Sequence, residues 1–201
     1  MEKLIYCFCL LASFTISAQT FQEMSEAFQK SYAFEAQAKY DASADALKKL
    51  PGDNYEVQLR LGWLYYLAGK WDLAQSHYKK ASQFRPASLE PLLGLVNVNV
   101  AREEWNLVEQ AYLSILKIDP KNVNANYQLG LIYYVRKNYT KALTYFSIYL
   151  NMYPFTYEAV QMSAWTHYFL GKNTEAKVLF QKCLLLRPND PSALEGLSLI
   201  K

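Results

Sequence analysis

Few residues in this 201-residue sequence could act as a nucleophile or a base. The only histidines are His77 and His167, and Cys183 is the only cysteine after the first ten residues. His167 and Cys183 could form a thiol–imidazole dyad, in which the imidazole deprotonates the thiol. Neither an orienting third group nor an oxyanion-binding motif accompanies them, and a buried free cysteine usually behaves as a small hydrophobic residue. The sequence therefore predicts no catalytic residues, with a thiol enzyme built on Cys183 as an alternative.

Metal, nucleotide and nucleic-acid sites have no support in the sequence. One cysteine and two distant histidines do not provide the ligand spacing of a metal site. No glycine-rich phosphate-binding motif occurs. The formal net charge is only +3, and the lysines and arginines are scattered, whereas a nucleic-acid surface requires clustered cations. We therefore expect no metal, no cofactor and no nucleic-acid partner.

The first eighteen residues have the pattern of a secretory signal peptide. Lys3 precedes an apolar run from Leu4 to about Phe14, and small or polar residues follow as far as Ala18. The apolar run is about half of the ~20 residues that a membrane-spanning helix needs. We expect cleavage after Ala18 and a periplasmic or secreted protein without a transmembrane segment. A membrane anchor formed by the uncleaved segment is the alternative.

A period of 34 residues organises the remaining chain. Prolines recur at this spacing, namely Pro86, Pro120, Pro154 and Pro188. Aromatic residues share it, at Tyr78, Tyr112, Phe146 and Phe180. A third set, mostly of alanine, keeps the same register, at Ala74, Val108, Ala142 and Ala176. Periods of 20 to 50 residues indicate an array of repeated supersecondary units.

The repeated unit resembles the tetratricopeptide repeat. The second unit shows this best, since LGWLYYLAGKWDLAQSHYKKASQFRP carries the family's residues at Leu61, Gly62, Tyr65, Gly69, Trp71, Ala74, Tyr78, Ala81 and Pro86. The resemblance implies an all-α fold, in which stacked helix-turn-helix repeats form a right-handed superhelical solenoid over residues 19–201. We expect repeats at 55–88, 89–122, 123–156 and 157–190, after an irregular repeat at about 24–54 and before a capping helix at 191–201.

The residue types suit this arrangement. Small residues at Gly62 and Ala74 allow the two helices of a hairpin to approach closely, and Pro86 ends the second helix. One hairpin cannot bury its apolar face alone, so neighbouring hairpins must stack. The repeat at 89–122 departs from the pattern because Val96 and Val108 replace both small residues.

The resemblance also implies a groove, lined by the first helices of successive repeats, that binds a peptide or a partner helix. The candidate groove residues are mostly large aromatic side chains, which are suited to anchoring a partner: Trp63, Tyr66, Asn97, Tyr127, Tyr134, Trp165 and Tyr168. Alternatively, several of these rings simply pack on the next helix. Family members that bind chaperones grip a terminal carboxylate with Lys, Asn and Arg. The corresponding places here hold no cation, so we expect no such clamp.

The resulting functional prediction is a non-catalytic scaffold that binds other proteins within an exported envelope or secreted complex. A receptor for a small ligand or a glycan could use the same aromatic groove and is the second hypothesis. Amide side chains beside the rings, at Asn97, Asn124 and Gln161, are the groups that such a receptor would use.

Overall fold

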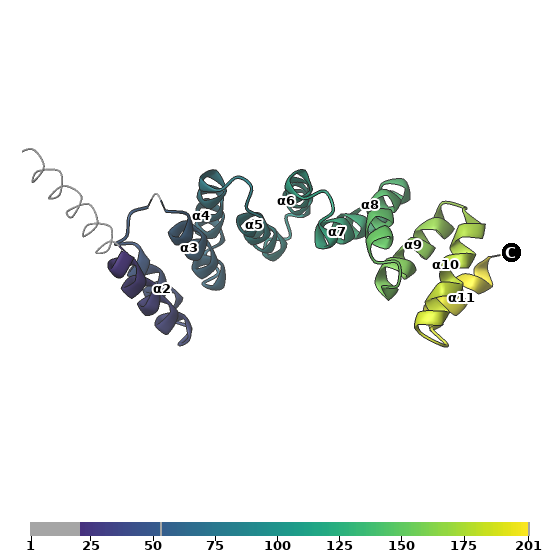
Figure 1. Ribbon diagram of the computed structural model, residues 1–201, viewed down its shortest axis with the longest axis horizontal. Coiled ribbons are helices and arrows are strands. Elements are labelled where there is room, and N and C mark those ends of the chain that lie inside the picture. Colours follow the sequence, from purple (N-terminus) through teal and green to yellow (C-terminus); the bar gives the residue numbers. More distant parts are fainter. Residues whose placement is uncertain (1–20, 53, 201) are drawn as a thin grey trace, which may run out of the picture. The chain divides into compact units, whose positions relative to one another are not determined.

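The computed structural model describes residues 21–52 and 54–200, and every regular element within these ranges is a helix. The chain divides between Glu103 and Glu104 into two compact units, which are described separately. Each unit consists of antiparallel helices that stack in chain order (Figure 1). This architecture confirms the predicted all-α class of stacked helix-turn-helix repeats. The predicted signal peptide, residues 1–18, lies outside the described residues.

The first unit contains a complete hairpin with helices packed on both of its sides. Its helices are residues 21–35, α2 (Tyr40–Leu47), α3 (Tyr55–Leu67), α4 (Trp71–Phe84) and α5 (Glu90–Ala101). The hairpin is α3 with α4; α2 packs on α3, and α5 packs on both helices of the hairpin. Its buried core is mainly aliphatic and aromatic, with Leu47, Leu61, Leu64, Tyr65, Tyr78 and Val98 as members.

The second unit continues the same alternation. Its helices are α6 (Trp105–Ile118), α7 (Val123–Val135), α8 (Tyr139–Met152), α9 (Tyr157–Phe169), α10 (Asn173–Leu186) and α11 (Pro191–Leu199). Each helix packs on the next in sequence, and α11 also touches α9. The boundary between the two units falls inside the predicted repeat 89–122, the repeat with valine at both small-residue positions.

Side-chain caps define several of the helix starts. The Asn54 side chain accepts a hydrogen bond from the Val57 amide at 3.1 Å, and Asn122 does the same for Ala125 at 3.0 Å. Asp190 caps α11 through the Ala193 amide at 2.8 Å, directly before Pro191. Such caps satisfy amide groups that have no partner within the helix. These three caps lie two periods apart, and the intervening first helices α5 and α9 have no side-chain cap.

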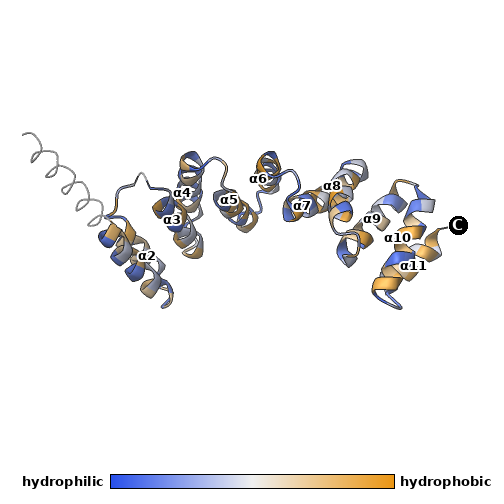
Figure 2. Cartoon of the chain, viewed as in Figure 1, coloured by the Kyte–Doolittle hydropathy of each residue, from blue (hydrophilic) through white to orange (hydrophobic). Residues whose placement is uncertain are grey.

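The two helices of a hairpin differ in how their apolar residues are distributed. The second helices, such as α4, have one apolar side and one polar side, whereas the first helices, such as α3, α7 and α9, are apolar on several sides. Figure 2 shows both hydrophobic and hydrophilic residues along each helix. A helix that is apolar all round is normally buried. The first helices nevertheless leave some of their apolar residues exposed, which is unusual for such helices.

Close packing between repeats depends on rings that lie against glycines. A Cβ atom added at Gly62 would come within 2.7 Å of the Tyr78 ring, and one added at Gly94 would overlap the opposite part of the same ring. Phe146 lies against Gly130 and Phe180 lies against Gly196 in the same manner. The ring that recurs every 34 residues thus fills the space between helices where the backbone lacks a side chain.

The turn between the two helices of each hairpin uses one residue with a positive φ angle. These residues also recur every 34 positions: Gly69 (φ 69°), Glu103 (φ 57°), Lys137 (φ 57°) and Gly171 (φ 70°). In the irregular first repeat the corresponding residue is Ala38 (φ 55°), which precedes Gly69 by 31 rather than 34 positions. The irregular repeat is therefore three residues shorter than the others, and the shorter segment lies between Ala38 and Gly69.

Replacing Lys137 by glycine should stabilise the protein. A left-handed conformation costs a residue with a Cβ atom about 1 kcal/mol, and glycine does not have this cost. Lys137→Gly should therefore raise the free energy of unfolding by up to about 1 kcal/mol, as measured by urea denaturation. The matched control is Gly171→Ala, which should lower it by a similar amount, since no atom lies near the added methyl group. Equal stability of all three proteins would contradict the assigned turn geometry.

Candidate functional site

The first helices of the first unit expose a mainly apolar surface. On α3, the rings of Trp63 and Tyr66 lie 5.8 Å apart, and Trp63 is 37% exposed. The adjacent α5 carries Leu93 (38% exposed) and Val100 (42% exposed), with the exposed Asn97 between them on the same side of the helix. We call these five residues the first inner face. It contains three of the predicted groove residues.

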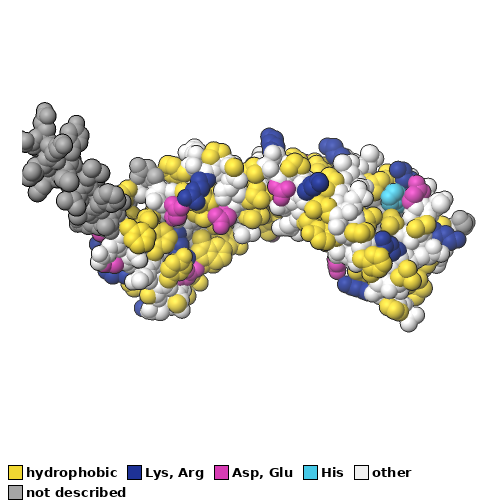
Figure 3. Space-filling view, in the orientation of Figure 1, with side chains coloured by type: hydrophobic (Ala, Val, Ile, Leu, Met, Phe, Trp, Pro, Cys, Tyr) yellow, Lys and Arg dark blue, Asp and Glu magenta, His cyan; other side chains and the backbone are white. Residues whose placement is uncertain are grey.

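A second aromatic surface lies on α7 and α9 of the second unit. The rings of Trp165 and Tyr168 are 5.7 Å apart, and Phe169 lies 5.9 Å from Trp165 and 5.9 Å from Tyr134. Phe169 is 45% exposed, and the other three rings are half-buried. We call these four residues the second inner face. Figure 3 shows hydrophobic side chains spread over the visible face of the chain, with charged side chains scattered among them.

Tyr127 has a different environment from the other predicted groove residues of α7 and α9. Its half-buried ring packs on Tyr149 at 5.5 Å and on Phe146 at 6.2 Å. Burial also raises the pKa of its hydroxyl. Tyr134 touches Phe146 as well, at 6.5 Å, so Phe146 links the two tyrosines. Tyr127 thus contributes to packing between α7 and α8, as the alternative interpretation of the aromatic pattern had it.

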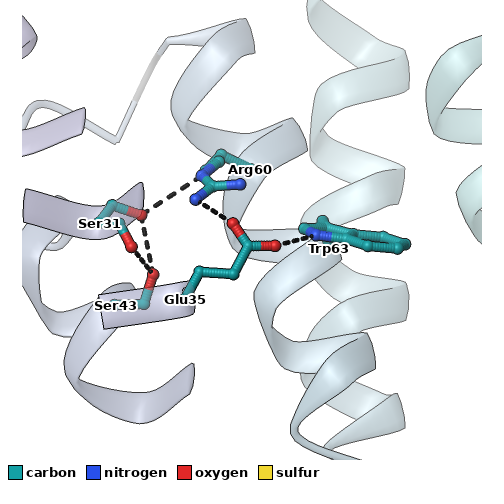
Figure 4. A network of polar contacts seen from close by, with 5 residues as sticks. All are labelled: Ser31, Glu35, Ser43, Arg60 and Trp63. Carbon is teal, nitrogen blue, oxygen red and sulfur yellow. Dashed lines mark hydrogen bonds and ion pairs between the residues drawn. The ribbon is translucent and has the colours of Figure 1, made fainter. Parts of the chain in front are cut away.

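A polar network holds the exposed tryptophan of the first inner face (Figure 4). The Trp63 indole donates to Glu35 Oε1 at 2.7 Å, and Arg60 donates to Glu35 Oε2 at 2.5 Å. Arg60 also donates to Ser31 Oγ at 3.3 Å, and Ser43 Oγ donates to the Ser31 carbonyl at 2.6 Å. The network connects the irregular first repeat to α3. The sequence pattern did not reveal it, because its acceptors do not follow the 34-residue period.

Trp165 is held in a comparable manner by a different partner. Its indole donates to Ser192 Oγ at 2.8 Å, and Ser192 belongs to α11. Its ring also packs edge-on against the buried Phe180, with the ring centres 5.0 Å apart. Trp165 therefore combines a packing role with partial exposure.

Two arginines repeat one arrangement at the ends of second helices. Arg85 lies over the Tyr55 ring at 4.1 Å and pairs with Glu56, and Arg187 lies over the Tyr157 ring at 3.5 Å and pairs with Glu158. Sequence reasoning did not identify these contacts. Their signal is nevertheless present, because a Tyr-Glu pair is followed by an Arg-Pro pair at the same spacing in both repeats. These pairs neutralise charges at the start of α3 and α9.

Pairs of stacked rings also occur at equivalent positions of two hairpins. Tyr65 stacks on His77 at 5.2 Å in the first unit, and Tyr133 stacks on Tyr145 at 5.6 Å in the second. The Tyr133 hydroxyl donates to Glu109, and burial together with this hydrogen bond raises the pKa of Tyr133 to about 12. The same bond lowers the pKa of the Glu109 carboxyl. The Tyr133 hydroxyl and the Glu109 carboxylate are thus paired with each other, and the stacked rings contribute to the packing of the hairpins.

Cys183 has the environment of a structural residue. It is fully buried among Val160, Ala164 and Phe180, and burial raises the pKa of its thiol to about 11. A catalytic cysteine needs a lowered pKa, since the thiolate is the nucleophile. Burial also lowers the pKa of His167, and no hydrogen bond between described residues joins it to Cys183. The geometry therefore gives the thiol-enzyme alternative no support.

Cys183 should resist alkylation in the folded protein. With a pKa of about 11 and no exposure, iodoacetamide at pH 8 should leave the thiol unmodified for hours and modify it quickly in guanidinium chloride. Intact-mass spectrometry measures both reactions. Cys183→Ser should fold normally, with a loss of about 1 kcal/mol in the free energy of unfolding. Rapid modification of the native protein would restore the thiol-enzyme hypothesis.

Both histidines should make the protein less stable in mild acid. Burial is the main cause that lowers the pKa of His77 and of His167 below 6.5, and Lys80 and Lys172 act in the same direction. The unfolded chain therefore binds protons more readily than the folded protein. The contribution of the two histidines to the free energy of unfolding is fully present above pH 6.5, and it is lost as the pH falls through their lower pKa values in the folded state. Urea denaturation should show this between pH 7.5 and 5.0. The His77→Gln/His167→Gln variant should show a flatter dependence.

The described part of the chain contains neither a metal-binding cluster nor a membrane-spanning helix. No three His, Cys, Asp or Glu side chains gather there in a group that could hold a metal ion. None of the helices described combines the length and the apolar character required to cross a membrane.

Comparison with known proteins identifies the repeat. Family models of the tetratricopeptide repeat match residues 56–88, 98–155 and 157–190. A tetratricopeptide repeat protein 21 homolog of Caenorhabditis briggsae is 26% identical over 151 residues, which are 75% of this chain and 11% of that protein. A TPR repeat-containing protein of Methanocaldococcus jannaschii is 32% identical over 133 residues, 63% of this chain and 23% of that protein. The chain thus spans a small part of both relatives.

Solved structures share the fold at low sequence identity. A tetratricopeptide repeat protein from Parabacteroides merdae superposes with a TM-score of 0.69 at 22% identity, covering 88% of this chain and 72% of that one. A MamA protein gives a TM-score of 0.66 at 22% identity, covering 82% and 92%. The matches to three family models together cover more than half of the residues, and those at 56–88 and 157–190 coincide with predicted repeats. The chain therefore belongs to the tetratricopeptide repeat family.

Proposed function

We propose that this protein is a non-catalytic scaffold that binds a peptide or a helix of another protein on its two inner faces. The observation that carries the proposal is the exposure of large apolar side chains on helices that are otherwise apolar all round. Trp63, Leu93 and Val100 in the first unit and Phe169 in the second are each more than a third exposed. Exposed apolar patches of this kind are typical of interaction sites.

The neighbouring charges support a binding role rather than a catalytic one. Arg60 pairs with Glu35 at 2.5 Å, and Arg187 pairs with Glu158 at 3.0 Å, so each of these charges already has a partner. Aromatic side chains supply a large contact area with little loss of conformational entropy on binding. Proteins of this repeat family generally bind other proteins, which agrees with the chemistry of the inner faces.

Site-specific photo-crosslinking in the native host tests which face meets the partner. A benzoylphenylalanine at Asn97 lies on the first inner face, and one at Lys79 lies on the exposed side of α4. Irradiation should join a partner protein to the Asn97 variant and not to the Lys79 variant, and mass spectrometry identifies it. Crosslinks from Lys79 alone would reject the inner faces as the binding surface.

The proposal includes export, for which the support is the sequence pattern of residues 1–18. The partner would then belong to an envelope or secreted complex. The intact mass of protein isolated from its native source should correspond to a chain that begins at or near Gln19. A mass that includes residues 1–18 would favour the membrane-anchored alternative.

A further inference from the structure

The hydrogen-bonding group of the first exposed indole is already occupied. Trp63 donates its Nε1–H to Glu35 Oε1 at 2.7 Å, and the second oxygen of this carboxylate is occupied by Arg60 (Figure 4). The Glu35 side chain is 22% exposed and that of Arg60 is 9% exposed, so water competes weakly for these bonds. Trp63 can therefore offer a partner only the surface of its ring.

Trp165 occupies the position equivalent to Trp63 three periods later, and its indole is occupied as well. Its Nε1–H donates to Ser192 Oγ at 2.8 Å. The acceptor in the first unit comes from a preceding helix, and the acceptor in the second unit comes from the following helix α11. Two unrelated side chains thus produce the same result.

The charged groups of the first helices are also mostly satisfied. Five charged residues other than histidine occur on α3, α5, α7, α9 and α11: Glu56, Arg60, Glu90, Glu158 and Glu195. Ion pairs include Glu56, Arg60 and Glu158, and Glu90 accepts a hydrogen bond from Tyr55 at 2.8 Å. An acidic partner side chain buried against either face would therefore lack a free opposite charge, which is unfavourable, and a basic one would have only ring faces to contact.

We propose that each inner face binds an uncharged peptide segment that carries aliphatic or proline side chains, and that Glu35 and Ser192 are positioning residues for the two indoles. This inference rests on the proposed function and specifies its partner. Ring surfaces with occupied N–H groups attract apolar and flat groups and cannot donate to a carboxylate or a carbonyl. Leu93 and Val100 extend the apolar surface beside Trp63, and Phe169 extends it beside Trp165.

Selection from a phage-displayed library of random twelve-residue peptides tests the partner class directly. The full chain should enrich Leu, Ile, Val and Pro and deplete Asp, Glu, Lys and Arg. Selected peptides should bind at least tenfold more weakly to Trp63→Ala or to Trp165→Ala. Trp63→Phe should weaken binding by about as much as Glu35→Ala, because it keeps a ring but loses the N–H group through which Glu35 orients it.

The outcomes separate the two levels of the proposal. Charged peptides that still require Trp63 or Trp165 would overturn the inference about the partner and leave the binding faces intact. Selected peptides that bind both alanine variants at full strength would overturn the proposed binding faces. A selection that yields no specific peptide would overturn both.

The positioning role of Glu35 is tested with its conservative variant. Glu35→Ala should lower the affinity for the peptides that depend on Trp63 by about fivefold to tenfold. Glu35→Gln keeps an oxygen acceptor and should retain most of the affinity. In a chain whose other tryptophans are replaced by phenylalanine, Glu35→Ala should shift the fluorescence emission of Trp63, and Glu35→Gln should shift it less. The matched control is Glu26→Ala, which lies on the same helix. Unchanged affinity and emission in Glu35→Ala would overturn the positioning role.

Discussion

The Trp165→Ala/Tyr168→Ala variant should lose partner binding by a factor of a hundred or more. These rings form the centre of the second inner face, with Phe169 packed against both at 5.9 and 5.4 Å. A well-buried aromatic anchor contributes roughly 2 kcal/mol to binding, and two such anchors correspond to about three powers of ten if their effects add. Isothermal titration calorimetry with the crosslinked partner, or with a selected peptide that requires Trp165, measures the change.

Two controls make this result interpretable. Trp165 also packs on Phe180 and donates to Ser192, so circular dichroism must first show that the variant keeps its helices. Charge reversal at Lys79 and Lys80, on the exposed side of α4, should change the affinity little. Full binding by a folded Trp165→Ala/Tyr168→Ala variant, together with weak binding by the Lys79/Lys80 variant, would place the partner on the opposite side of the hairpins.

Gly62→Ala should destabilise the protein by about 2 to 3 kcal/mol. The added methyl group would lie 2.7 to 2.9 Å from three carbon atoms of the Tyr78 ring, which is closer than side chains pack. The ring cannot move away, since its other part lies against Gly94 of the following repeat. Overpacking of a rigid core of this kind typically costs 1 to 3 kcal/mol, and the enclosure of Tyr78 favours the upper end. Urea denaturation of the full chain measures the loss.

The matched control for this prediction is Gly52→Ala. Its added methyl group would lie 3.8 Å from Gln58, an ordinary contact, so the free energy of unfolding should change by less than about 0.5 kcal/mol. A double-mutant cycle with Tyr78→Leu should show a coupling of about 1 kcal/mol or more, because the leucine leaves room for the methyl group. Additive effects at Gly62 and Tyr78 would mean that the two residues do not contact each other.

The sequence by itself determined the repeat family and the hairpins. Contacts within the hairpins join residue types that recur in the sequence, such as the ring at Tyr78 and Phe146 against the glycine at Gly62 and Gly130, two periods apart. Local signals recur in part: asparagine caps α3 and α7, and glycine occupies the left-handed turn position at Gly69 and Gly171, whereas Glu103 and Lys137 occupy it in the two turns between. Because every repeat packs two equivalent helices against each other and against its neighbours, the sequence pattern was sufficient to predict these elements.

Only the tertiary structure decided which aromatic residues pack and which stay exposed. Tyr127 packs against Phe146 and Tyr149, whereas Trp165 packs on Phe180 with one edge and joins the exposed Phe169 with another. The acceptors for the two indoles, Glu35 and Ser192, lie on opposite sides of their tryptophans in sequence and follow no common spacing. The physical reason is that exposure and hydrogen bonding depend on side chains from neighbouring repeats, which differ from one repeat to the next. The 34-residue period specifies where a ring lies on its helix. The side chains of the neighbouring repeats decide whether that ring is buried or stays exposed.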